Sequence, residues 1–202
     1  MTMLREFREP DAREAEENLR VIRDLMERST KYSTFAGLSG VTAGVASIIG
    51  CLLTHRMGGN PADFPVAFLV TWSLVIIIAV GADYLLMKRR AARAGKRVLS
   101  RLGKQMVIAS APGLGSGAML TLYFMQHKIL GDIYPVWMLA YGIAVCATGL
   151  FSQREVSYLG AAFLLAGAGT LLIPGWGLLM MAVTFGGFHI IYGIIMSRKD
   201  GW

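Results

Sequence analysis

Six long stretches of the chain consist almost entirely of apolar, glycine and small hydroxyl residues. They cover residues 35–54, 64–87, 106–126, 133–151, 157–173 and 177–196. A hydrocarbon core about 30 Å thick needs roughly 20 apolar residues in a helix. None of the stretches alternates apolar and polar positions, as the strands of a membrane barrel would. The pattern therefore predicts an all-α integral membrane protein with six transmembrane helices.

Composition and charge add an orientation to this picture. The chain is 54% hydrophobic and only 16% charged, whereas soluble domains carry about 25% charged residues. Of its 20 Lys and Arg residues, only Arg56 and Lys128 fall on the side opposite the two termini. Positive residues are retained in the cytoplasm, so both termini, including the tail 197–202, are predicted to be cytoplasmic.

Residues 1–34 form a highly charged segment ahead of the first apolar stretch. Proline suits the first turn of a helix, and the segment is predicted to form a charged amphipathic cytoplasmic helix from about Pro10. Its apolar positions follow a spacing of three and four residues: Ala12, Ala15, Leu19, Ile22 and Met26. Two interpretations stay open. The helix rests on the membrane surface or other loops, or it docks a cytoplasmic protein partner or a second copy of the chain.

The connection predicted at residues 88–105 is strongly basic and contains no acid. Its eight cations are Lys88, Arg89, Arg90, Arg93, Lys96, Arg97, Arg101 and Lys104. Near anionic lipid each is worth about 1 kcal/mol, so the sequence predicts contacts with lipid headgroups. Nucleic-acid binding is not predicted, because the loop has no interleaved aromatic residues and no recognisable binding fold.

Two ionisable residues inside the apolar stretches are the main candidates for a functional site. Asp83 lies near the cytoplasmic end of the second stretch and His189 lies within the sixth. Ionisable groups are costly in hydrocarbon and mark functional sites by default. An Asp83–His189 pair would relay protons or bind a cation, or would simply hold two helices together. Alternatively, Lys88 or Arg89 folds back to form an ion pair with Asp83.

The string Pro-Gly-x-Gly occurs twice, and each occurrence is a candidate helix break. The positions are Pro112, Gly113 and Gly115, and Pro174, Gly175 and Gly177. In a three-plus-three arrangement of helices these strings fall near the starts of corresponding helices, as in an inverted-repeat transporter. Proline is also simply favoured at the first turn of a helix. The sequence favours two helix starts and keeps the transport-related break as the alternative.

Small residues also predict where helices approach closely. Ala36, Gly40 and Gly44 lie four residues apart on the first helix, which is the spacing of a small-residue packing face.

Other chemistry is not indicated. There is no nucleophile motif, phosphate loop or paired carboxylate, so no enzyme activity, cofactor or metal is predicted. Cys51 and Cys146 fall at different depths, which disfavours a disulfide. His55 and His127 belong to the boundary opposite the cytoplasm, far from His189, which disfavours a bis-histidine haem.

Three segments carry a resemblance to a protein family. They are "LRVIRDLMERSTKYSTFAGLSGVTAG", "REVSYLG" and "FGGFHIIYGIIM". Together they resemble a family of small multi-pass bacterial inner-membrane proteins for which no activity is established, with Glu27-Arg28-Ser29-Thr30 and His189 as recurrent elements. The resemblance implies a bacterial cytoplasmic membrane location and the six-helix architecture.

Three functions follow as hypotheses. The first is a non-enzymatic, sensor-like interaction or regulatory protein acting through residues 1–34. The second is a small proton- or ion-coupled transporter that uses Asp83 and His189. The third is an accessory subunit of a larger membrane complex.

Overall fold

A computed structural model describes residues 16–20, 22, 37–93 and 101–200. The chain divides into two units, Met1–Lys31 and Tyr32–Trp202. In the first unit, residues 16–20 and 22 are helical. The remainder of the predicted N-terminal helix lies outside the described residues, and so does most of the predicted docking segment.

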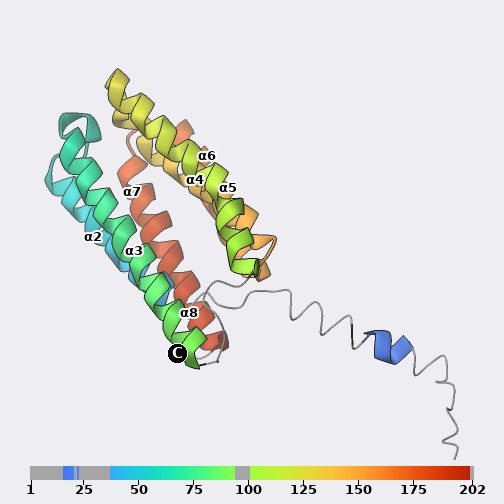
Figure 1. Cartoon of the computed structure of the whole chain (residues 1–202). Coiled ribbons are helices and arrows are strands. Elements are labelled where there is room, and N and C mark those ends of the chain that lie inside the picture. The colour runs from blue at the N-terminus through green and yellow to red at the C-terminus, as the bar shows by residue number, and fades with distance from the viewer. Residues whose placement is uncertain (1–15, 21, 23–36, 94–100, 201–202) are drawn as a thin grey trace, which may run out of the picture. The chain divides into compact units, whose positions relative to one another are not determined.

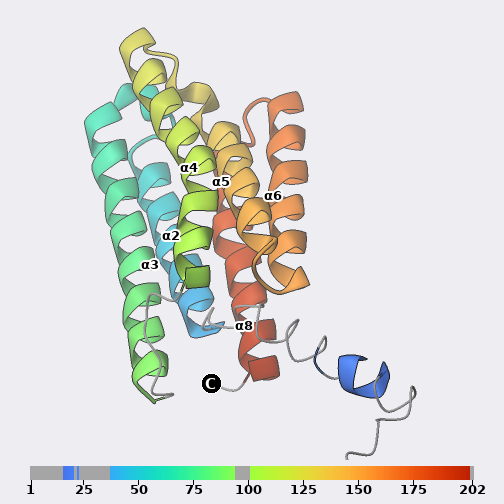
Figure 2. The ribbon, with the colours of Figure 1, turned by 45° about the vertical axis from the view of Figure 1, so that its right-hand side comes forward.

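The second unit is a helical bundle (Figures 1 and 2), and its described part contains no strand. Five crossings are single helices: α2 (Gly37–Arg56), α3 (Pro65–Arg93), α4 (Arg101–His127), α5 (Ile133–Gly149) and α6 (Arg154–Leu172). The sixth combines α7 (Gly177–Met181), the π-helix η3 (Ala182–Phe188) and α8 (His189–Asp200). Short 3-10 turns η1 (Pro61–Asp63) and η2 (Leu130–Asp132) lie in two connections.

Six helical segments are long and apolar enough to cross a membrane. This confirms the predicted helical class of the described residues and the presence of six helices of membrane-spanning length. The bounds differ most around the basic connection, because α3 continues to Arg93 and α4 already starts at Arg101. Much of the predicted loop 88–105 is therefore an extension of two helices. Arginine and lysine have good helix propensity, which favours such extensions beyond the apolar stretches.

Glycines determine the closest packing in the bundle, between α2 and the sixth crossing. A Cβ atom on Gly44 would lie 2.6 Å from the carbonyl oxygen of Gly186, and one on Gly193 would lie 2.5 Å from that of Gly37. Backbones therefore meet directly, as small residues allow in a bilayer. The predicted close approach at Gly40 and Gly44 is confirmed, since Gly40 faces Gly193.

Glycines also give a close approach between α4 and α5. A Cβ on Gly113 would lie 2.8 Å from the carbonyl oxygen of Ala140 and 2.9 Å from the amide of Ala144. Gly117 also faces Ala140, at 3.0 Å from its Cβ. Small residues from two consecutive crossings thus bring α4 against α5.

The packing pattern repeats between the first three crossings and the last three. Helix α2 packs on α3 and on the sixth crossing, while α5 packs on α6 and on α4. The first and fourth crossings therefore occupy corresponding positions.

Candidate functional site

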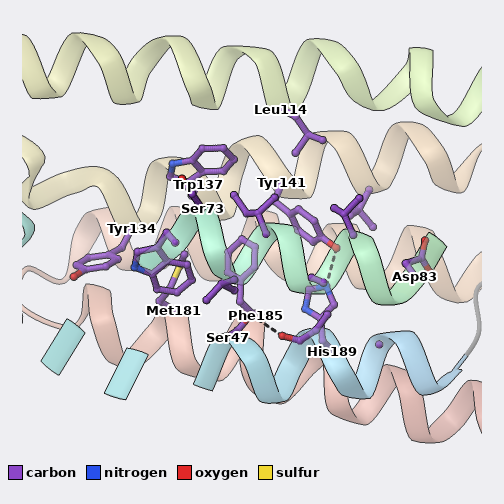
Figure 3. Close-up of a pocket in the computed structure, with 18 of the residues that line it drawn as sticks. Ser47, Ser73, Asp83, Leu114, Tyr134, Trp137, Tyr141, Met181, Phe185 and His189 are labelled. Atoms are coloured by element: carbon purple, nitrogen blue, oxygen red, sulfur yellow. Dashed lines mark hydrogen bonds between the residues drawn. The ribbon is translucent and has the colours of Figure 1, made fainter. Parts of the chain in front are cut away.

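A cavity of about 500 Å³ lies within the second unit, among α3, α4, α5, η3 and α8, with α2 at its base. Its wall consists mainly of aliphatic and aromatic side chains, and Figure 3 shows Tyr134, Trp137, Tyr141 and Phe185 on it. Ligand sites in proteins commonly have this size and this predominance of apolar groups with a few polar ones.

The cavity opens between α3 and α4. Ile76 and Val80 on α3 and Leu114 on α4 all line it, yet they are 48%, 63% and 38% exposed. The two helices border the cavity without packing closely on one another. All three residues belong to segments of membrane-spanning length, so the mouth is apolar and lies part-way along the helices.

His189 and Tyr141 form the central polar contact of the wall. The His189 Nε2 and Tyr141 Oη atoms are 2.7 Å apart, and His189 is only 8% exposed. Tyr141, Phe163, Phe185 and His189 also contact one another through their rings. This aromatic cluster joins α5, α6, η3 and α8 behind the cavity.

The other imidazole nitrogen of His189, Nδ1, has different surroundings. Nδ1 is buried and makes no hydrogen bond of good geometry, although the backbone carbonyls of Thr184 and Phe185 lie near the ring. The tautomer that serves both nitrogens has the Tyr141 hydroxyl donating to Nε2 and the proton on Nδ1 facing these carbonyls. His189 then acts as a neutral acceptor on the side that meets Tyr141.

The π-helix η3 sets the position of His189. It covers Ala182–Phe188 and ends directly before the histidine. A π-helix widens the turn, and such segments are rare and frequent at functional sites. Thr184 within it is fully buried, and its hydroxyl donates to the carbonyl oxygen of Met180 at 2.7 Å. Gly186, also within it, provides the close contact with α2.

Asp83 lines the same cavity from α3 and lies at one end of the drawn site, beyond Tyr141 and His189 (Figure 3). A side-chain hydrogen bond joins it to Ser39 at the start of α2. The described contacts join Asp83 to Ser39 and His189 to Tyr141, so each of the two residues has a hydrogen-bond partner on another helix. No ion pair from Lys88 or Arg89 to Asp83 is found in the described part of the chain. Both predicted residues nevertheless line one cavity.

Most other polar groups of the wall form hydrogen bonds within the protein. Ser47 donates to the carbonyl oxygen of Ala43 and Thr121 to that of Gly117, both at 2.8 Å. Thr121 also accepts a 3.0 Å hydrogen bond from the indole N–H of Trp137. Such bonds to the preceding helical turn let hydroxyl groups lie in an apolar helix. By contrast, the indole N–H of Trp72 is buried with no partner among the described residues.

The two Pro-Gly-x-Gly strings have different structural roles. Pro174 and Gly175 lie in the turn between α6 and α7, Gly175 has a φ of 89°, and Gly177 starts α7. This string marks a helix start, as the sequence favoured. The same interpretation is wrong for Pro112, which lies inside α4 together with Gly113 and Gly115. Eleven residues of preceding helix, beginning at Arg101, carry the chain through the proline.

The predicted lipid-headgroup residues lie at helix ends. Lys88, Arg89 and Lys104 are exposed on α3 and α4. Arg90 and Arg93 belong to the last turns of α3 and Arg101 is the first residue of α4, whereas Lys96 and Arg97 lie outside the described residues. Among the described residues, no cluster of three His, Cys, Asp or Glu side chains forms a metal site.

No family model, no curated protein and no solved structure matches this chain. The site therefore rests on its own geometry. Sequence reasoning missed Tyr141, Ser39 and the π-helix. A signal for Tyr141 existed, because a tyrosine in the middle of an apolar helix needs a partner for its hydroxyl.

Proposed function

We propose that this protein is a small-molecule carrier of a bacterial cytoplasmic membrane, with both termini in the cytoplasm. The observation that carries this proposal is the 500 Å³ cavity between α3 and α4. Its apolar mouth fits a ligand that arrives from the lipid rather than from water. The orientation follows from the distribution of Lys and Arg.

One feature favours transport over static binding. The cavity opens between two helices that barely contact each other, α3 and α4, so relative motion of these helices breaks few contacts. Tightly packed interfaces resist such motion.

A matched pair of variants tests the cavity as a ligand site. Ala79 lines the cavity from α3, whereas Ala161 is exposed on α6 and lies away from it. Ala79→Trp fills the cavity, and Ala161→Trp adds the same bulk to the outer surface. Native mass spectrometry then counts the molecules of a neutral apolar probe, N-phenyl-1-naphthylamine, held by each purified protein.

We expect one probe molecule on the wild type and on Ala161→Trp, and none on Ala79→Trp. Equal occupancy of all three proteins would show that the probe is held by general lipid-facing surface and would refute the ligand site. Counterflow of a bound probe in reconstituted vesicles then tests movement. Binding without counterflow would favour the receptor-like regulatory alternative, in which residues 1–34 act on a cytoplasmic partner.

A further inference from the structure

Asp83 is the group of the described cavity wall that would carry a full charge when ionised. Among the described lining residues it is the only Asp, Glu, Lys or Arg. The nearest lysine along α3, Lys88, is five residues away, which is about 7.5 Å along the helix axis. A carboxylate within an apolar cavity is costly unless a cation pairs with it or a proton neutralises it. When Asp83 is ionised, the cavity therefore has a place for one positive charge.

The rest of the wall suits a cation that also has an apolar body. Aromatic side chains from several elements line it: Phe68, Trp72, Trp137, Tyr141, Phe185 and Tyr192. Aromatic faces attract ammonium and related cations by their quadrupole, in addition to burying apolar area. Aliphatic residues such as Ile76 and Val80 extend this surface to the mouth.

An inorganic ion fits the site less well. Hard cations take about six or more oxygen ligands, whereas the structure places the Ser39 hydroxyl as the hydrogen-bond partner of the Asp83 carboxylate. Elsewhere in the wall, the hydroxyl groups of Ser47, Thr121 and Thr148 bond to their own helix. A cavity of about 500 Å³ is also far larger than a bare ion requires.

We propose that the ligand is an organic cation with an apolar body, whose positive group lies against Asp83 while its apolar part lies among the aromatic side chains. This inference rests on the proposed carrier function and specifies its substrate class. Ser39 holds the carboxylate in place through its hydrogen bond. His189 and Tyr141 bond to each other and present no positive charge to the ligand.

Two ions of nearly identical shape and opposite charge test the class on the wild-type protein. Tetraphenylphosphonium and tetraphenylborate differ in the sign of their charge and little else. In equilibrium dialysis against purified protein, with empty detergent micelles as background, we expect the phosphonium to bind at least about tenfold more tightly than the borate. Equal affinities, or a preference for the borate, would overturn the proposal without requiring any variant to fold.

Substitutions at Asp83 test whether its carboxylate is the group that binds the phosphonium. Asp83→Asn keeps the size of the side chain and an oxygen that accepts from Ser39, and we expect it to weaken phosphonium binding about ten- to a hundredfold. Asp83→Glu keeps the charge and should retain most of the affinity. Asp63→Asn, at an exposed carboxylate outside the cavity, is the matched control and should bind like the wild type. Wild-type affinity in a folded Asp83→Asn protein would contradict the proposal.

Binding of the neutral probe distinguishes failure of the proposed substrate class from failure of the proposed carrier function. If Ala79→Trp removes the neutral probe while Asp83→Asn leaves phosphonium binding unchanged, the cavity is a ligand site and the cationic class is wrong. If no probe distinguishes Ala79→Trp from Ala161→Trp, the carrier proposal fails and the substrate class fails with it.

Discussion

The α2–α8 interface and the border between α3 and α4 are made from similarly apolar helices, yet they pack in opposite ways. At α2–α8, glycines such as Gly37 and Gly193 place backbone against backbone. Along α3 and α4, branched side chains such as Val80 and Leu114 face a cavity instead of a neighbouring helix. The comparison indicates that the first region provides a fixed scaffold and the second provides the changeable site.

A large residue at the tight interface should produce the largest effect. A side chain on Gly193 would meet the carbonyl oxygen of Gly37 and the amide of Val41, at 2.5 and 2.7 Å from its Cβ. Because both are backbone atoms, no rotamer change relieves the clash. We expect Gly193→Leu to lower the free energy of unfolding by about 3 kcal/mol or more, measured by denaturant titration in detergent.

Gly169→Leu is the control for that variant. Gly169 lies in α6, and nothing lies within 4 Å of a Cβ built there. Its stability should stay within about 0.5 kcal/mol of the wild type. If the two variants unfold alike, the distinction between a rigid and a loose region fails.

Loss of the tyrosine hydroxyl should have an intermediate effect, because it touches the wall of the cavity. Tyr141→Phe removes the 2.7 Å bond to His189 and leaves a buried imidazole nitrogen unpaired, at a cost of about 1 to 2 kcal/mol. Tyr123→Phe is the matched control, since Tyr123 is 50% exposed and its contacts with Phe124 and His127 are made by the ring. Equal stability of the two variants would show that the His189–Tyr141 pair contributes nothing to the wall.

The smallest effect is expected on α4, the helix that borders the open side. Pro112 is exposed within α4 and offers no amide hydrogen to the helix. Pro112→Ala restores that donor and should raise stability by about 1 kcal/mol, less than the roughly 3 kcal/mol cost of proline in a soluble helix, because membrane helices adapt to proline. Binding of the neutral probe should not change.

The same variant decides between two roles for Pro112. If Pro112→Ala stabilises the protein and retains probe counterflow, the proline is a tolerated interior residue. If it abolishes counterflow while binding persists, the proline is a functional break, which was the alternative suggested by the paired Pro-Gly-x-Gly strings.

The coarse fold could be predicted because apolar length is a property of the local sequence. Six stretches of about 20 apolar residues have few structural solutions in a bilayer. Close packing at Gly40 and Gly44 could also be predicted, since small residues at a spacing of four are typical of a helix interface. The interior position of Pro112 could not be predicted, because the local sequence around a proline can be the same at the first turn of a helix and within one. Here the residues from Arg101 onward extend the helix ahead of the proline.

The site was only half predictable. Asp83 and His189 stand out because ionisable groups are rare in apolar helices, and both line the cavity. Their true partners, Ser39 and Tyr141, come from other helices and depend on which helices meet. The π-helix Ala182–Phe188 widens the turns directly before His189. A sequence reading based on about 3.6 residues per turn therefore does not predict which way the His189 side chain faces.

The most direct test of the central claim is to locate a bound ligand covalently. A triphenylphosphonium that carries a diazirine is photolysed on the reconstituted protein, and the labelled residues are mapped by mass spectrometry. We expect adducts on cavity residues such as Trp72, Val80 and Trp137, and we expect excess tetraphenylphosphonium to remove them. Adducts spread over outward-facing positions such as Leu165 and Leu172 of α6, with no protection, would show a compound dissolved in lipid and would contradict a binding cavity between α3 and α4.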